Sequence, residues 1–191
     1  MFTGIIEAIG TVKNIEPSGT NIHFWIESPF FHELKIDQSV AHDGVCLTID
    51  ATEGHLYRVT AIKETLEKTN LSLWNINKKV NLERGMILGA RLDGHLVQGH
   101  VDCTGTCVDV KEEGGSWLYT IEFPENFNRL IIEKGSICMN GTSLTAFNIT
   151  NDTFSVAIIP YTYNLTNINE LAQNSMVNLE FDLVGKYVTK L

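Results

Sequence analysis

The sequence lacks the features expected of nucleic-acid-binding, secreted and membrane-spanning proteins. Its 191 residues include 14 lysines and arginines against 23 aspartates and glutamates, and no basic run occurs. Binding driven by phosphate neutralisation is therefore not expected. The first residues, MFTGIIEAIGTVKN, have no basic n-region, and Glu7 interrupts their apolar run, so no secretory signal is predicted. No stretch approaches the ~20 apolar residues of a membrane span, and we expect a cytoplasmic protein.

Disulfide pairs and the common catalytic motifs are also missing. The four cysteines, Cys46, Cys103, Cys107 and Cys138, form no C-x-x-C pair, which indicates reduced thiols. The sequence contains no G-x-G-x-x-G, G-x-x-x-x-G-K-[ST], H-E-x-x-H or G-x-S-x-G motif. These absences argue against dinucleotide-binding, triphosphate-binding, zinc-protease and esterase functions.

The sequence does contain an internal repeat. With a shift of 97 residues, Gly44 aligns with Gly141, Thr48 with Thr145, and the segment VNLE at 80–83 with VNLE at 177–180. Nearer the start the shift is 95, since residues 4 and 99 are both glycine. We therefore predict two similar domains, residues 1–86 and 87–183, followed by a short helical tail at 184–191. A domain of this size can bury its own core.

Most of the hydrophobic patterning has the period of two that is typical of strands. In WLYTIEF, Trp117, Tyr119 and Ile121 occur at every second position and would share one face of a strand. In HFWIES, Phe24 and Trp25 would lie on opposite faces. The dipeptides DG at 43–44 and NG at 140–141 predict tight turns at equivalent places. Apart from the tail, short helical segments are expected at 30–34, 64–68, 125–133 and 169–173. This pattern favours an all-β fold, with a small antiparallel barrel made twice.

The repeat aligns Cys46 with Ser143, so the two copies differ where a nucleophile is expected. Because Cys46 follows a tight turn by two residues, its thiol can face a pocket from a fixed backbone. A buried cysteine also serves as a small apolar residue, and this structural role is the alternative. The hydroxyl at the equivalent position favours a functional role for both.

His95 and His100 lie five residues apart in DGHLVQGH. On a strand they would point to opposite faces, so they are not expected to share a metal. His100 aligns with Ile5, and only the second copy has this histidine. A structural histidine is the alternative, but Gly99 lets a ligand approach the backbone and imidazole transfers protons near neutral pH. We therefore favour a functional role for His100.

Six segments together resemble the riboflavin synthase family: MFTGI, SVAHDGVCLT, KETLEKTNL, DGHLVQGHVD, NGTSLT and VNLEFD. They occur in the order and spacing of that family across nearly the whole chain. The resemblance implies two tandem six-stranded Greek-key β-barrels with short helices and a short C-terminal helix. It also implies the dismutation of two molecules of 6,7-dimethyl-8-ribityllumazine into riboflavin and 5-amino-6-ribitylaminouracil, with no metal or organic cofactor.

The resemblance implies a homotrimer whose active site joins the first barrel of one subunit to the second barrel of a neighbour. Association with lumazine synthase is left open. The chain departs from the family at two places. Asp43 stands where the family often has asparagine before the glycine, which should leave the turn intact. The tail after Asp182 is short for a helix that helps to hold a trimer.

The family's functional positions map onto individual residues of this chain. The resemblance implies catalytic roles for Phe2, Cys46, His100, Ser143 and Asp182. It implies substrate contacts for Gly4, Ser39, Thr48, Ala61, Glu64, Thr65, Gly99, Thr145, Ile159 and Thr162.

The chemistry of the implied reaction suits these side chains. The C7 methyl group of the lumazine is acidic because its anion delocalises into the ring, and His100 is a candidate base for its proton. Cys46, Ser143 or a water that they position are candidates for the nucleophile at C7 of the second lumazine. The alternative is a non-enzymatic lumazine- or flavin-binding protein with the same double barrel. The presence of Cys46, His100 and Ser143 argues against it.

Overall fold

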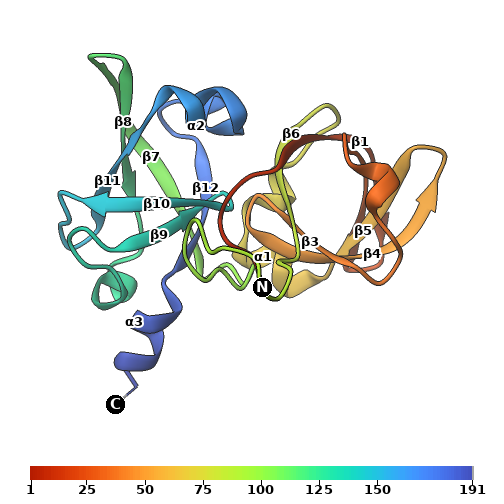
Figure 1. Cartoon of the computed structure of the whole chain (residues 1–191), viewed down its shortest axis with the longest axis horizontal. Helices are drawn as coiled ribbons and strands as arrows, with labels where there is room; N and C mark the ends of the chain where they lie inside the picture. Colours follow the sequence, from red (N-terminus) through yellow and green to blue (C-terminus); the bar gives the residue numbers. More distant parts are fainter. Residues whose placement is uncertain (191) are drawn as a thin grey trace.

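The strand-patterned segments form two closed antiparallel barrels that lie side by side in the computed structural model, which describes residues 1–190 (Figure 1). The first barrel has strand order β1-β2-β5-β4-β3-β6, and consists of β1 (Ala8–Ser18), β2 (Asn21–Glu27), β3 (Ser39–His42), β4 (Val45–Glu53), β5 (Leu56–Ala61) and β6 (Lys79–Arg84). The second has the equivalent order β7-β8-β11-β10-β9-β12, and consists of β7 (Cys103–Glu113), β8 (Ser116–Glu122), β9 (Ser136–Met139), β10 (Thr142–Phe147), β11 (Thr153–Ile158) and β12 (Met176–Phe181). The predicted all-β double barrel is confirmed.

The two predicted tight turns join β3 to β4 and β9 to β10. Asp43 and Gly44 have φ values of 45° and 81°, and Asn140 and Gly141 have 45° and 80°. Positive φ at both central residues is the geometry of a two-residue hairpin that follows the twist of its strands. The two turns also touch each other, since a Cβ on Gly44 would lie 2.8 Å from the Gly141 nitrogen.

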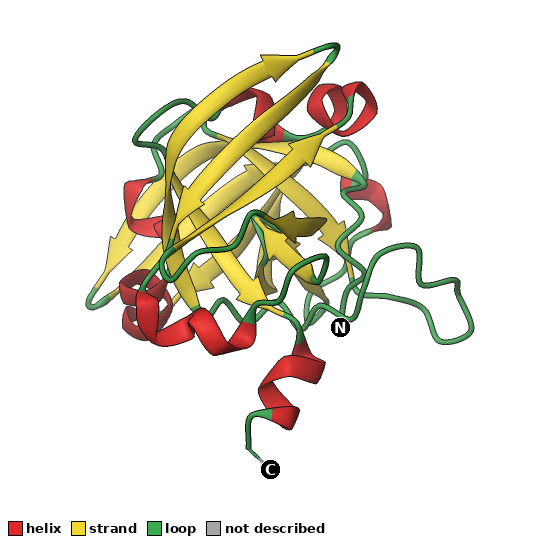
Figure 2. Ribbon diagram, turned by 90° about the vertical axis from the view of Figure 1, so that its left-hand side faces the viewer, coloured by secondary structure: helices red, strands yellow, loops and turns green. Residues whose placement is uncertain are grey.

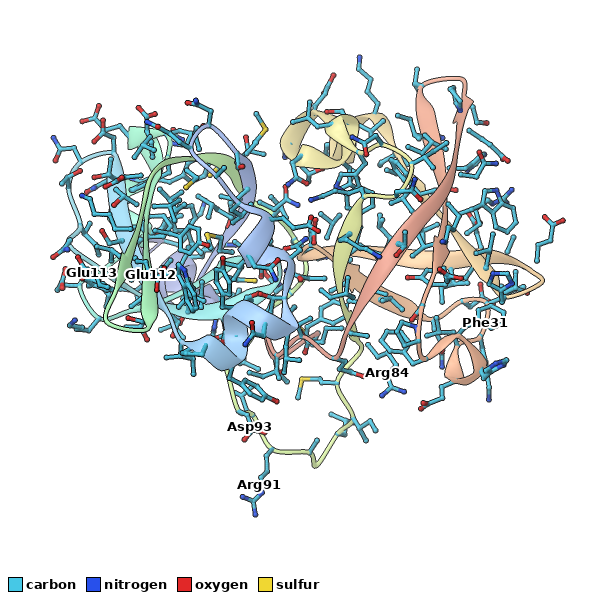
Figure 3. All side chains as sticks on the ribbon, turned by 90° about the horizontal axis from the view of Figure 1, so that it is seen from above. Phe31, Arg84, Arg91, Asp93, Glu112 and Glu113 are labelled. Atoms are coloured by element: carbon cyan, nitrogen blue, oxygen red, sulfur yellow. The ribbon has the colours of Figure 1, made fainter. Side chains whose placement is uncertain are left out.

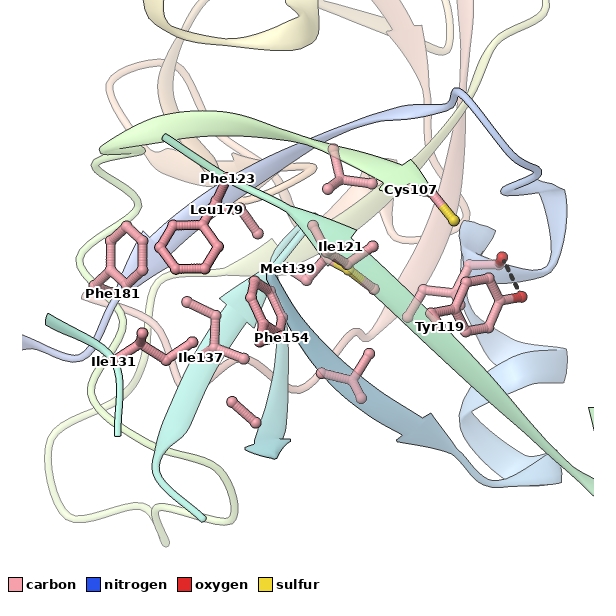
Figure 4. Close-up of a cluster of buried hydrophobic side chains, with 14 of the residues drawn as sticks. Cys107, Tyr119, Ile121, Phe123, Ile131, Ile137, Met139, Phe154, Leu179 and Phe181 are labelled. Carbon is pink, nitrogen blue, oxygen red and sulfur yellow. Dashed lines mark hydrogen bonds between the residues drawn. The ribbon is translucent and has the colours of Figure 1, made fainter. Parts of the chain in front are cut away.

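Each barrel encloses its own apolar core, as the period of two predicts. Phe24 and Ile26 on β2 are buried in the first barrel, whereas Trp25 between them is partly exposed. In the second barrel the buried side chains of β7 to β12 meet inside the sheet (Figure 4). The hydroxyl of Tyr119 donates to the backbone oxygen of Ile168 at 3.0 Å, which satisfies the polar end of a ring with 1% exposure.

The helices are short and lie outside the barrels (Figure 2). They are η1 (Phe31–Glu33), α1 (Lys63–Lys68), η2 (Asn70–Leu73), η3 (Glu125–Leu130), α2 (Pro160–Leu165), η4 (Asn167–Glu170) and α3 (Leu183–Val188), where η marks a 3-10 helix. The helix expected at 64–68 is confirmed as α1. The helix expected at 169–173 is wrong, because only a 3-10 turn reaches Glu170 and the α-helix lies earlier. Pro160 occupies the first turn of α2, where the missing N–H costs nothing.

The C-terminal helix α3 begins at an N-cap formed by Asp182, whose Oδ1 accepts from the N–H of Val184 at 2.9 Å. An ion pair of 2.6 Å joins Lys186 to Asp102 and ties the helix to the segment before β7. Leu191, the last residue of the predicted tail, lies outside the described residues. Among residues 1–190, no helix is long and apolar enough to cross a membrane.

The contact between the barrels is polar and nearly symmetric. The side-chain amide of Asn81 donates to the backbone oxygen of Asn140, and that of Asn178 donates to the backbone oxygen of Asp43, both at 2.9 Å. Asn167 breaks the symmetry, because its side chain donates to Asp43 Oδ1 at 2.8 Å. Burial raises the pKa of Asp43 to about 7.

Candidate active site

The leading segment of each copy crosses to the barrel of the other copy. Phe2 and Val97 form an antiparallel bridge between the two segments. The carbonyl of Gly99 accepts the N–H of Cys46 at 2.8 Å, and the carbonyl of Gly4 accepts the N–H of Ser143 at 2.7 Å. The candidate nucleophile of each barrel is therefore fixed by a glycine from the other copy.

Two buried carboxylates hold the crossing segments in place. Glu180 accepts from the backbone N–H groups of Gln98, Gly99 and His100 at 2.7 to 2.9 Å. Its counterpart Glu83 accepts from the N–H and hydroxyl of Thr3 and from the N–H of Gly4, at 2.6 to 3.0 Å. Burial raises the pKa of both carboxyls, and the N–H donors act in the opposite direction. Sequence analysis missed their role, although the repeated VNLE placed both residues at equivalent strand ends.

The glycines in these segments have no room for a side chain. Gly4 and Gly99 have φ values of 76° and 80°, in the left-handed region that disfavours L side chains. A Cβ on Gly4 would lie 2.6 Å from the Cβ of Ser143, and one on Gly99 would lie 2.6 Å from the Cβ of Cys46. Their expected ligand contacts therefore have to use backbone atoms.

Cys46 lies on β4 and is partly exposed, with Phe2 fully buried in the same cluster. A Cβ on Gly99 would also meet the Phe2 ring at 2.8 Å, so the ring supports the glycine that holds Cys46. His100 follows directly and is exposed, with its backbone fixed by Glu180. The structure therefore brings three of the predicted residues, Phe2, Cys46 and Gly99, into contact.

The other residues predicted for the first barrel lie on β3, β4, β5 and α1. Ser39 and Thr48 face each other across the β3–β4 pair, and both are exposed. Thr65 lies on α1 and is partly exposed. Ala61 is fully buried in the core of the first barrel, so its side chain is turned away from a ligand outside the sheet. Glu64 is exposed and pairs with Lys68 at 2.9 Å.

A cavity of about 540 Å³ contains the residues predicted for the second barrel. It is lined by Ser143, Thr145, Ile159 and Thr162, together with Asp93, Gly94, Lys134, Ser136, Leu144, Phe147 and Ala157. Lys134 was missed by sequence analysis, and its ammonium lies 4.7 Å from the centre of the Phe147 ring. A second cavity, of about 710 Å³, contains Ser39 and shares Asp93 with the first. The loop that carries Asp93 and Arg91 projects from the barrels (Figure 3).

His95 is a further candidate residue that sequence analysis did not select. Its Nδ1 lies 2.6 Å from the hydroxyl oxygen of Ser143, and its exposed fraction is only 8%. Burial lowers the pKa of His95, and the negative charge of Asp182 acts in the opposite direction. The expectation that His95 and His100 lie on one strand is wrong, because this segment has only the single bridge at Val97. Within residues 1–190, no group of three His, Cys, Asp or Glu side chains is placed to hold a metal.

The lumazine binding domain family matches the chain twice, at residues 3–85 and 98–182. Riboflavin synthase from Actinobacillus pleuropneumoniae is 38% identical over 98% of this chain and 88% of that protein. Riboflavin synthase from Brucella abortus (strain 2308) is 36% identical over 100% of this chain and 98% of that protein.

Solved structures with the same fold include LumP complexed with riboflavin (TM-score 0.88, 23% identity) and LumP complexed with 6,7-dimethyl-8-(1'-D-ribityl) lumazine (TM-score 0.86, 21% identity). Each alignment covers 95% of this chain and 99% of the LumP chain. At this identity the likeness concerns the fold. Together with the full-length sequence matches, the comparisons show that the chain belongs to the riboflavin synthase family and contains two lumazine binding domains.

Proposed function

We propose that the chain catalyses the dismutation of two molecules of 6,7-dimethyl-8-ribityllumazine into riboflavin and 5-amino-6-ribitylaminouracil. The observation that carries this proposal is the pair of equivalent backbone frames around Cys46 and Ser143, each closed by a glycine carbonyl of the other copy. A reaction that joins two copies of one substrate needs two similar binding pockets. It also needs a chemical difference between the two pockets, so that one substrate becomes the donor and the other the acceptor. The thiol of Cys46 in the first barrel and the hydroxyl of Ser143 in the second supply this difference.

The pocket residues fit the steps of this reaction. Exposed His100 accepts a proton from the acidic C7 methyl group of one lumazine, while Glu180 fixes its backbone. Thr145 and Thr162 in the second cavity, with Thr48 and Thr65 in the first copy, provide hydroxyls for the ring and ribityl groups. Holding two rings face to face contributes further, since oriented reactants reach effective molarities of roughly 10⁵ to 10⁸ M.

The assembly proposed for this reaction is a homotrimer in which the first barrel of one subunit faces the second barrel of its neighbour. The exposed apolar residues Ile87, Leu88 and Val184, on the projecting loop and on α3, support such an interface. We further propose residues 1–86 and 87–183 as the two lumazine-binding units, with 184–191 as the tail. The proposed location is the cytoplasm, and association with lumazine synthase remains part of the proposal.

The test is to mix purified protein with 6,7-dimethyl-8-ribityllumazine alone and to follow riboflavin by absorbance. We expect one riboflavin for each two lumazines consumed, without an added cofactor. Lumazine binding detected by fluorescence, with no riboflavin formed, would instead identify a carrier protein. Sedimentation of the same sample tests the trimer.

A further inference from the structure

At the second cavity, Ser143 is associated with a histidine and an aspartate that do not occur at the equivalent positions of the first copy. Ser143 aligns with Cys46, and Asp182 aligns with Gly85 at the same shift of 97. His95 has no counterpart, because a shift of 95 places it before Met1. The second copy therefore has a serine, a histidine and an aspartate where the first copy has a cysteine, no residue and a glycine.

The serine lies at the cavity, the histidine lies behind the serine, and the aspartate acts on the histidine. Ser143 lines the second cavity, whereas His95 is not among the lining residues and is buried next to the Ser143 hydroxyl at 2.6 Å. Asp182, the N-cap of α3, places a negative charge that favours the protonated imidazole. The backbone N–H of His95 donates to the carbonyl of Thr3 at 3.1 Å, which fixes the ring beside the serine.

A hydroxyl and a thiol differ in what they need in order to react. A serine hydroxyl is a weak nucleophile unless an adjacent base takes its proton, whereas a cysteine thiol ionises far more readily and is intrinsically more nucleophilic. Within residues 1–190 no histidine hydrogen-bonds to the Cys46 thiol, whereas His95 Nδ1 lies 2.6 Å from the Ser143 hydroxyl oxygen. This correlation is the expected one if both side chains act as nucleophiles.

We infer that His95 is a positioning residue that activates Ser143 as the nucleophile toward C7 of the lumazine in the second pocket. The inference rests on the proposed function. The Ser143 oxygen forms a bond to C7, an electron pair moves from C7 into the pyrimidinedione ring, and the hydroxyl proton passes to Nδ1 of His95. When the C–O bond breaks, its electron pair stays on the serine oxygen, the pair held in the ring moves back to C7, and His95 returns the proton to Ser143.

The charged groups near the imidazole set the pH range in which the serine is active. Asp182 acts on His95 from the start of α3, and Asp93 lies two residues away in the same loop. Because burial lowers the pKa of His95, the ring is neutral and able to accept a proton at pH 7. The turnover number is therefore expected to fall as the pH drops through the pKa of this histidine.

The experiment compares His95→Asn in two backgrounds, the natural Ser143 and Ser143→Cys. Asparagine keeps an oxygen near the position of Nδ1 but accepts no proton. With Ser143 we expect kcat at pH 7 to fall about 100-fold, within the range typical of a lost general base, with an unchanged Kd for lumazine. With Ser143→Cys the same change should lower kcat by less than about 3-fold, because a thiol is partly ionised at pH 7 and depends less on a base.

His55→Asn, at an exposed histidine that pairs with Glu27, is the matched control and should leave kcat unchanged. An equal loss in both backgrounds, or a weaker Kd for lumazine that accounts for the loss, would overturn the inference. If His95→Asn does not fold, His95→Gln is compared in the same two backgrounds, with the same expected difference. Failure of the natural protein to form riboflavin would refute the proposed function instead, and lumazine fluorescence separates that outcome from a misfolded protein.

Discussion

The two barrels share one backbone frame and differ in the side chains placed on it. The N–H of Asp37 donates to the carbonyl of Ile49 at 2.9 Å, and at the equivalent place the N–H of Lys134 donates to Ala146 at 2.9 Å. The side chains of Asp37 and Lys134 have opposite charge, yet the backbone hydrogen bond is the same. Since backbone hydrogen bonds carry the frame, the sequence at such positions is able to diverge without a change of fold.

The neighbouring positions increase the contrast between the pockets. Asp50 in the first copy accepts from Arg58 at 2.7 Å and also from Thr60. The equivalents of Asp50 and Thr60 in the second cavity are Phe147 and Ala157. The second cavity therefore offers an aromatic ring with a lysine ammonium over it, where the first copy has an aspartate bonded to its own barrel. Two copies of one lumazine would meet different surroundings in the two barrels.

The largest predicted effect concerns the one charged residue at the inter-barrel turns, Asp43. Its folded-state pKa of about 7 exceeds its usual value of 3.8, so the folded state holds the proton more tightly than the unfolded chain. The free energy of unfolding therefore has its full value below about pH 4 and falls as the pH rises through 7. At about 1.4 kcal/mol per pKa unit, the loss is on the order of 4 kcal/mol.

Asp43→Asn, which copies Asn140, should remove this loss and be more stable than the natural protein above pH 7. Denaturant unfolding from pH 5 to pH 8 measures the difference between the two proteins, in which the titration of other groups cancels. Asn140→Asp is the matched control and should introduce a similar pH-dependent loss. Parallel stability curves for the natural protein and Asp43→Asn would show that Asp43 is not the cause.

The next effect concerns the crossing glycines, which should behave alike in the two copies. Gly4→Ala and Gly99→Ala each combine a left-handed backbone with a Cβ 2.6 Å from the facing side chain. Strain of about 1–2 kcal/mol and overpacking of about 1–3 kcal/mol predict a loss of about 3 kcal/mol of stability in each variant.

Chemical denaturation of both variants measures this loss. Gly54→Ala is the control, since its φ of 60° gives the strain with no atom within 4 Å of the added Cβ. A much smaller loss in one crossing variant than in the other would show that the two crossings are not equivalent.

A smaller effect is expected from the carboxylates that hold the crossing segments. Glu180→Gln and Glu83→Gln each leave one acceptor oxygen and turn an amide toward N–H donors. Loss of charge-assisted hydrogen bonds predicts about 2 kcal/mol less stability in each.

The two carboxylate variants should disturb lumazine binding in different barrels. Glu180→Gln releases the segment that carries Gly99 and His100, and so should disturb the pocket of Cys46. Glu83→Gln releases Gly4 and should disturb Ser143. Lumazine titration followed by fluorescence measures the affinity of each variant for lumazine. Weaker binding at the same pocket in both variants would contradict this assignment.

Much of the architecture was predictable because it is encoded locally. The alternation around Phe24 and Tyr119 predicted strands, and the dipeptides at 43–44 and 140–141 predicted hairpins whose φ values follow from their residue types. The missed helix α2 was also within reach, since the repeat places it opposite the α1 segment that the sequence did predict.

The sequence by itself determined the repeated barrels, their hairpins and the difference between Cys46 and Ser143, because side-chain periodicity and turn propensity act over a few residues. Only the tertiary structure decided that Gly4 contacts the second barrel and Gly99 the first. It also decided that His95 contacts a serine 48 residues away in the chain. Such contacts depend on how two closed sheets pack against each other. That packing satisfies buried carbonyl, N–H and carboxylate groups that no local pattern pairs.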